Sequence, residues 1–164
     1  MIEAVIFDLD GTLIYLPVDY ERLFQDFSRI MKTEKVHPLT KVISSLDKKT
    51  RSKIFQVWDN AELAALANMT VNEDGMGLYK KFLGKPKALV TMQGEALVQR
   101  VLKRLDLSFK FVVTRECCLD RTEQLKIAAE KLKIPFKNLL FIGNTADDSL
   151  AAKKVGCQFL RVKK

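Results

Sequence analysis

Histidine and cysteine are scarce in this sequence of 164 residues. The single histidine, His37, precedes Pro38 in a polar stretch, so we expect it at the surface. One such histidine leaves no basis for a histidine-based triad or a metal site with several histidine ligands. The three cysteines, Cys117, Cys118 and Cys157, have no metal-ligand spacing. This composition predicts a protein of the reducing cytoplasm without a metal–thiolate site.

Long apolar runs are also missing. No run approaches the roughly 18 residues that a membrane-spanning helix needs. The amino end continues directly into a charged motif, so we expect no signal peptide. Because 48% of the residues are hydrophobic, the chain can bury one good core with room for a small appendage. We therefore expect no membrane partner.

The net charge of +8 admits three kinds of partner: nucleic acid, an acidic lipid surface or small anionic substrates. The basic residues are spread along the chain, in pairs such as Lys48-Lys49, Lys80-Lys81, Lys153-Lys154 and Lys163-Lys164. Most are interleaved with acids at helical spacing, and no nucleic-acid-binding motif accompanies them. The pattern favours a solvated surface that weakly attracts phosphorylated substrates, with no nucleic-acid partner.

Five short apolar runs are present, and they predict buried strands. They are Ile2–Phe7, Ala88–Val90, Phe109–Val113, Leu139–Ile142 and Phe159–Val162. Helical periodicity lies between the later runs, over Glu95–Leu105, Thr122–Lys133 and Ser149–Val155, where Gly156 would end the last helix. Strands that alternate with helices predict an α/β fold: a Rossmann-like, parallel five-stranded sheet with helices on both faces.

The segment between the first two runs has a different pattern, with no convincing strand. Tyr20–Met31 is amphipathic, and Asp47 can cap a long helix. Thr70-Val71-Asn72-Glu73 reads as a capping box before another helix, which Gly84-Lys85-Pro86 would end. We therefore predict a small all-helical insert over residues 15–84, and a core domain made of residues 1–14 and 85–164.

The most informative stretch is Val5–Thr12, where the first strand stops on Asp8 and Asp10. Side chains at i and i+2 of a strand point the same way, so the two carboxylates should converge. Two buried like charges are costly unless a cation or a proton neutralises one of them. In open parallel sheets such side chains meet beyond the carboxyl ends of the strands. Thr91 and the loop after Ile142 should reach the same edge.

These residues resemble the motifs of the haloacid dehalogenase (HAD) superfamily, and most closely its phosphoglycolate-phosphatase-like members. The resemblance runs in order along nearly the whole chain: Asp8-Leu9-Asp10-Gly11-Thr12, then Thr91, then Gly143-Asn144 to Ala152. It implies a helical cap that selects the substrate, inserted where the helical segment stands. Dehalogenases proper lack an acid at the position of Asp10, so the resemblance indicates phosphoryl chemistry.

The resemblance also implies roles for individual residues. Asp8 would be the nucleophile and Asp10 the general acid and base. Thr91, with the backbone at Met92, would bind the phosphate. A Mg²⁺ ion would be held by Asp8, the carbonyl of Asp10, Asn144 and waters steadied by Asp148. Asp147 is an additional acid that we interpret as a residue of the helix N-terminus.

Two positions depart from the family's pattern. The family has Asp where this chain has Asn144, which keeps one oxygen and drops a negative charge. Counting back from Gly143 by the family's spacing places its phosphate-binding lysine at Leu119, which cannot bind phosphate. Arg121, two residues on, is the better candidate for the missing cation, and Arg115 is the alternative.

The sequence thus favours a Mg²⁺-dependent phosphatase that hydrolyses a small phosphate monoester through an aspartyl-phosphate. The departures at Asn144 and Leu119 keep a second hypothesis open, an inactive or attenuated HAD-fold protein that binds a phosphorylated ligand. A phosphotransferase or sugar-phosphate mutase with the same intermediate is a third. The sequence predicts neither the substrate nor the oligomeric state.

Overall fold

The computed structural model describes residues 1–163. A five-stranded parallel sheet forms its centre, in the order β5-β4-β1-β6-β7. The strands are β1 (Ala4–Phe7), β4 (Lys87–Val90), β5 (Phe111–Val113), β6 (Leu139–Gly143) and β7 (Gln158–Arg161). Every residue of β1, β4 and β6 is buried, as expected for central parallel strands covered on both faces. The predicted fold class is confirmed.

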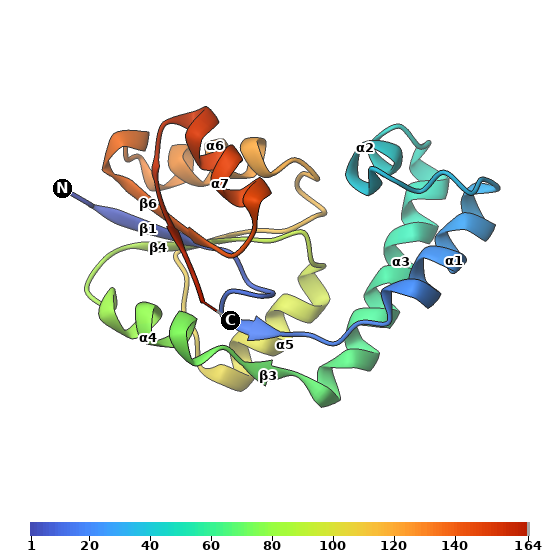
Figure 1. Cartoon of the computed structure of the whole chain (residues 1–164), viewed down its shortest axis with the longest axis horizontal. Helices are drawn as coiled ribbons and strands as arrows, with labels where there is room; N and C mark the ends of the chain where they lie inside the picture. The colour runs from blue at the N-terminus through green and yellow to red at the C-terminus, as the bar shows by residue number, and fades with distance from the viewer. Residues whose placement is uncertain (164) are drawn as a thin grey trace.

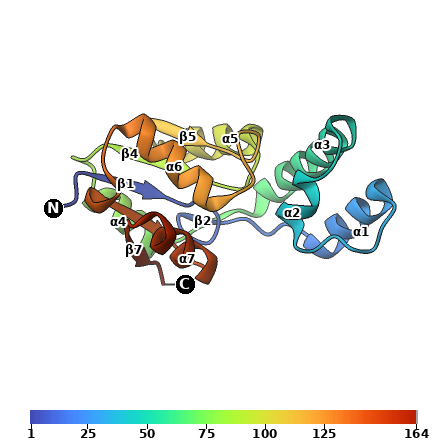
Figure 2. The same ribbon diagram turned by 90° about the horizontal axis from the view of Figure 1, so that it is seen from above.

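Helices cover both faces of this sheet (Figures 1 and 2). They are α4 (Glu73–Lys81), α5 (Glu95–Leu105), α6 (Arg121–Leu132) and α7 (Ala146–Val155), and a short 3₁₀ turn, η2 (Phe136–Asn138), precedes β6. Successive side chains of β1 enter different cores. Phe7 joins the cluster that contains Leu97 of α5, whereas Ile6 joins the cluster that contains Leu125 of α6 and Ala151 of α7.

Three further helices stand to one side of the sheet (Figure 1). They are α1 (Tyr20–Met31), α2 (Leu39–Ser44) and α3 (Lys48–Ala65), and a 3₁₀ turn, η1 (Leu66–Asn68), follows them. Asp19 caps α1 and Asp47 caps α3, each accepting a hydrogen bond from a backbone N–H three residues on. The rings of Phe27 and Trp58 meet edge to face, 5.7 Å between centroids, and join α1 to α3.

A two-stranded antiparallel ribbon connects these three helices to the sheet. It pairs β2 (Ile14–Tyr15) with β3 (Thr70–Val71). The sequence analysis expected no strand here and interpreted Thr70 as a helix cap, and that was wrong. Thr70 and Val71 are β-branched and extended, and Asn72 caps α4 by accepting a hydrogen bond from Asp74 N–H.

Helix α4 lies against the core. Its Tyr79 ring contacts Phe7 of β1, 6.0 Å between centroids. Gly75 allows the helix to approach the chain after Asp10, since a Cβ at this position would lie 1.7 Å from the carbonyl oxygen of Thr12. The division into domains at residues 14/15 and 84/85 stays a prediction. Helix α4 lies inside the predicted insert, but these contacts show that it packs against the sheet.

Other element ends differ by a few residues. The expected last helix begins at Ala146, earlier than Ser149, because Thr145 and Asp148 form a reciprocal capping box. Gly156 ends it in the left-handed conformation, φ 84°, as predicted. No helix of the described residues is both long and apolar enough to cross a bilayer.

Candidate active site

The carboxyl ends of three neighbouring strands converge on one small cavity. Asp8 follows β1, Thr91 follows β4 and Asn144 follows β6, and β1 lies between the other two. The cavity has a volume of about 170 Å³. Its lining residues are Asp8, Asp10, Tyr20, Trp58, Thr91, Met92, Gln93, Arg121, Asn144, Thr145 and Asp148. The structure therefore brings the candidate site residues from the sequence analysis to one place, with the exception of Arg115.

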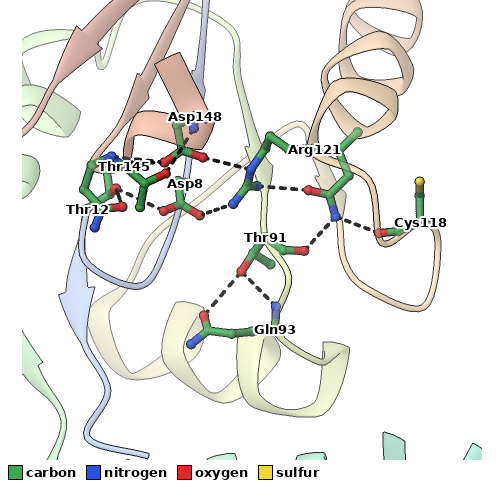
Figure 3. A network of polar contacts seen from close by, with 10 residues as sticks. Asp8, Thr12, Thr91, Gln93, Cys118, Arg121, Thr145 and Asp148 are labelled. Carbon is green, nitrogen blue, oxygen red and sulfur yellow. Dashed lines mark hydrogen bonds and ion pairs between the residues drawn. The ribbon is translucent and has the colours of Figure 1, made fainter. Parts of the chain in front are cut away.

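Asp8 is 5% exposed and has two polar partners. Its Oδ2 accepts a hydrogen bond from the Thr12 hydroxyl at 3.2 Å, and its Oδ1 lies 3.0 Å from Nη2 of Arg121 (Figure 3). Burial raises the pKa of Asp8 to about 6, with Asp148 adding to the rise and Arg121 opposing it. The carboxylate is thus ionised at neutral pH but only weakly stabilised in that form.

Asp10 faces a different partner from Asp8. Its Oδ1 accepts a hydrogen bond of 3.0 Å from the N–H of Leu16, at the start of the chain that leads to α1. Burial raises its pKa, while hydrogen bonds from Leu16 and Gly11 N–H groups oppose the rise. A raised pKa suits a carboxyl group that must both give and accept a proton.

Arg121 supplies the positive charge next to Asp8. It is the first residue of α6, and its guanidinium has three partners: Asp8 Oδ1 at 3.0 Å, Asp148 Oδ1 at 3.0 Å and Gln124 Oε1 at 2.9 Å. Figure 3 shows both carboxylates on the same side of the guanidinium, with a dashed line to each. Leu119, by contrast, is 9% exposed and packs in the core.

Asn144 and Asp148 also lie close to Asp8. The Thr12 hydroxyl is 3.3 Å from Asn144 Oδ1, so one hydroxyl lies within hydrogen-bonding distance of an Asn144 oxygen and an Asp8 oxygen. Asp148 Oδ2 accepts hydrogen bonds from the N–H groups of Asn144 and Thr145. Gly11, with φ 82°, packs on Asn144, where a Cβ would lie 2.1 Å from Nδ2.

The donor set near Asp8 consists of hard oxygens: carboxylate, amide and backbone carbonyl. Such oxygens are the ligands that Mg²⁺ prefers. No group of three or more His, Cys, Asp or Glu side chains within residues 1–163 has an arrangement that could hold a metal ion. A group of this kind contains only His, Cys, Asp and Glu, whereas one of the oxygens near Asp8 belongs to the amide of Asn144. The residues fit a magnesium site that has one carboxylate fewer than the family's motif, because Asn144 stands where the motif has Asp.

No protein-family model matches the chain. Two curated relatives, from Neisseria meningitidis and Neisseria gonorrhoeae, are 33% identical over 90 residues, and each is called phosphoglycolate phosphatase. The match covers 52% of this chain and only 38% of either relative.

Solved structures match over nearly the whole chain. A HAD-like family protein from Streptococcus pneumoniae matches with a TM-score of 0.69 at 19% identity, over 98% of this chain and 84% of its own. CbbY from Rhodobacter sphaeroides, in complex with phosphate, matches with a TM-score of 0.69 at 16% identity, over 97% and 85%. These likenesses establish the fold, and the Neisseria relatives add the sequence kinship. The chain has the fold of haloacid dehalogenase-like proteins.

The carboxyl end of β4, where we predict phosphate to bind, is held from two sides. The Thr91 hydroxyl accepts a hydrogen bond from Gln93 N–H at 3.1 Å and lies 3.3 Å from Gln93 Oε1. The Thr91 carbonyl accepts one from Gln124 Nε2 at 2.8 Å. Gln124 is fully buried and also contacts Arg121, so it ties the strand end to the guanidinium.

Arg115, the alternative candidate, lies elsewhere. Its buried guanidinium is paired with Asp59 and, at 2.8 Å, with Glu62 of α3, and it stacks 4.2 Å from the Trp58 ring. Burial raises the pKa of Glu62 to about 7, although Arg115 opposes the rise. Arg121 therefore lies beside Asp8, whereas Arg115 forms part of the contact between α3 and the domain that contains the sheet.

Six residues of the site escaped the sequence analysis: Thr12, Tyr20, Trp58, Gln93, Gln124 and Thr145. Gln93 follows Thr91 by two residues, and Thr145 stands within the last motif. Thr12 stands within the first motif, and Gln124 lies three residues after Arg121 on one helix, so all four had a positional signal. Tyr20 and Trp58 come from α1 and α3 and had none, because their approach to the cavity depends on how those helices pack on the sheet.

Proposed function

We propose that this protein is a Mg²⁺-dependent phosphatase that hydrolyses a small phosphate monoester. The observation that carries the proposal is the Arg121 guanidinium, which lies 3.0 Å from both Asp8 and Asp148. It places a cation beside the predicted nucleophile, where the family's lysine is missing. The family resemblance and the Neisseria relatives support the same activity.

In the proposed reaction, an oxygen of Asp8 attacks the phosphorus and the bond to the leaving oxygen breaks, which forms an aspartyl-phosphate. Asp10 gives its proton to the leaving oxygen. It then takes a proton from the water that attacks the phosphorus and releases phosphate, so that Asp8 is regenerated. The raised pKa of Asp10 supports both roles.

Thr91, the backbone N–H of Met92 and Arg121 would bind the non-bridging phosphate oxygens. Arg121 offers a planar fork that suits phosphate, and its charge offsets repulsion between Asp8 and an incoming dianion. Asp8, the carbonyl of Asp10 and Asn144 would hold Mg²⁺, with Asp148 close by. When bound, the ion supplies positive charge that neutralises the transferring phosphoryl group.

The partner predicted for this site is a small phosphorylated molecule. The relatives' name makes phosphoglycolate a first substrate to test, while the matched 90 residues leave most of those proteins unaccounted for. A cytoplasmic location stays a prediction from the composition, and the oligomeric state is not predicted.

Phosphate release from a panel of small monoesters, with and without Mg²⁺, tests the proposal. Asp8→Asn is nearly isosteric and should lower kcat by roughly a thousandfold or more while leaving the circular dichroism spectrum unchanged. Asp147→Asn, an exposed acid in the same helix as Asp148, is the matched control and should keep wild-type activity. If Asp8→Asn kept most of its activity, the nucleophile would be assigned wrongly. A wild type that binds phosphate esters and releases none would favour the non-catalytic hypothesis.

A further inference from the structure

Two side chains that line the cavity carry an N–H group without a hydrogen-bond partner. Trp58 and Gln93 are each 5% exposed, and Trp58 Nε1 and Gln93 Nε2 are buried without a hydrogen-bond partner. Unpaired buried donors are costly and rare, so each one calls for an explanation. Both residues line the cavity that contains Asp8 and Asp10. A ligand oxygen in this cavity would give the two donors a partner.

Gln93 is oriented by its neighbour Thr91. Its Oε1 lies 3.3 Å from the Thr91 hydroxyl, which also accepts from Gln93 N–H. The amide nitrogen is therefore directed away from Thr91, as Figure 3 shows. Trp58 is oriented by the Arg115 guanidinium, 4.2 Å from its ring, which Asp59 and Glu62 hold in turn. The two side chains that carry the donors are thus held by contacts within the protein.

The cavity has no spare positive charge for a second anion. Among the described residues that line it, Arg121 is the only cation, and Asp8 and Asp148 already engage its guanidinium. Behind Trp58, one arginine faces two acids, Asp59 and Glu62. A carboxylate or second phosphate on the leaving group would therefore meet uncharged donors beside excess negative charge.

We propose that Trp58 and Gln93 select the leaving group, and that the preferred substrate is a small phosphate monoester whose leaving group is uncharged and carries a hydroxyl or carbonyl oxygen. The cavity volume of about 170 Å³ is below the roughly 300–1,000 Å³ of sites for drug-sized ligands, which restricts the leaving group to a few atoms. The inference rests on the proposed phosphatase function. It departs from the relatives' name, because phosphoglycolate carries a carboxylate in its leaving group.

Three esters of two-carbon alcohols test the selection, since they differ only in the terminal group. They are 2-hydroxyethyl phosphate, phosphoglycolate and ethyl phosphate. Binding is measured to the Asp8→Asn variant with Mg²⁺, so that no turnover intervenes, by fluorescence of Trp58, the only tryptophan of the chain. We expect the hydroxyethyl ester to bind about tenfold tighter than the other two, the scale of one or two neutral hydrogen bonds. Equal or tighter binding of phosphoglycolate would overturn the inference.

Substitution of the two donors separates selection from a structural role. Trp58→Phe keeps an aromatic ring against Arg115 but removes the indole N–H with the five-membered ring, and Gln93→Leu removes the second donor. Each should reduce the preference for hydroxyethyl over ethyl phosphate, measured as the ratio of kcat/KM values, to about twofold or less. A uniform loss on all three esters, with the ratio unchanged, would mean that these residues only support the fold and would overturn the inference. If fluorescence shows the selectivity but no ester releases phosphate, the phosphatase proposal fails and the selection stands.

Discussion

The guanidinium of Arg121 balances the charge of the site. Without it, the buried carboxylates of Asp8 and Asp148 would have no counter-ion, and the charge of Asp148 raises the pKa of Asp8. Arg121 contacts both, and it contacts Gln124, which in turn contacts the Thr91 carbonyl. The Arg121 side chain thus connects Asp8, the predicted nucleophile, with the start of α7 and, through Gln124, with the end of β4 that is predicted to bind phosphate.

Arg121→Ala should lower kcat/KM for phosphate monoesters thirtyfold or more, about 2 kcal/mol, because it removes the cation that stabilises the transferring phosphoryl group. Arg121→Lys should lose less, since it keeps the charge but not the fork. Steady-state kinetics on purified variants provides the measurement. Arg29→Ala is the control, because the Arg29 side chain is 76% exposed and forms a surface ion pair with Asp26. A loss as small as that of the control would remove Arg121 from the mechanism.

The amide of Asn144 should weaken the metal site compared with a carboxylate. Asn144→Asp is nearly isosteric and adds a charged hard oxygen next to Asp8, so we expect Mg²⁺ to bind about tenfold tighter, a gain of about 1.4 kcal/mol. Titration calorimetry on both forms measures the difference. Asp147→Asn, at an exposed acid nearby, should leave the affinity unchanged. Unchanged or weaker binding by Asn144→Asp would indicate that Asp148 already serves as the ligand.

At the scale of elements, α3 is docked on the core by a buried ion cluster. Arg115 follows β5, and its partners Asp59 and Glu62 stand three residues apart on α3, directly after Trp58. Glu62 also accepts a hydrogen bond of 3.1 Å from Gly94 N–H, at the start of α5. Because these contacts join the helical insert to the sheet, they set how Trp58 reaches the cavity.

Arg115→Ala should therefore destabilise the protein by about 3–5 kcal/mol, the usual result of leaving a buried charge unpaired. The loss should be larger at pH 8 than at pH 6. In the wild type the pKa of Glu62 is about 7, with Arg115 opposing a larger rise, so Glu62 is mostly protonated at pH 6 and gains little from Arg115. At pH 8 the wild type holds a paired anion, whereas the variant must bury an unpaired anion or keep the proton at a cost in free energy. Urea denaturation at both pH values measures the difference.

A second change tests the cause of that loss. Glu62→Gln combined with Arg115→Met removes both main charges of the cluster, and it should restore much of the stability and abolish its pH dependence. Arg29→Ala again serves as the exposed control. If Arg115→Ala were equally destabilising at pH 6 and pH 8, packing on Trp58 rather than charge would account for the docking.

At the scale of the whole molecule, the net charge of +8 should assist the approach of a phosphate dianion. We expect kcat/KM to fall roughly two- to fivefold between 10 and 150 mM NaCl, as the Debye length shortens from about 30 to about 8 Å, while kcat stays constant. Initial rates at low and at saturating substrate measure the two parameters. A salt-independent kcat/KM would show that the basic residues only solvate the surface.

The sequence by itself determined the sheet, its buried strands and most helix limits, because apolar periodicity and capping residues act locally. It also placed Asp8, Asp10, Thr91 and Asn144 at one edge, since strand ends of a parallel sheet share that edge. Only the tertiary structure decided between the two arginines. Arg121 and Arg115 lie six residues apart with equal charge and reach. They have different acidic partners because α6 starts beside Asp8, while α3 lies beside the chain that follows β5.

The two-stranded ribbon β2–β3 and the unpaired N–H donors that line the cavity could likewise be found only from the tertiary structure. Two-residue strands such as Thr70–Val71 carry too little periodicity to be recognised without their partner strand. Trp58 has the pattern of an ordinary core residue of an amphipathic helix, and nothing in its neighbours reveals an unpaired indole N–H. Local sequence encodes local backbone and burial, whereas which side chains meet across 50 or more residues depends on how the packed elements fit together.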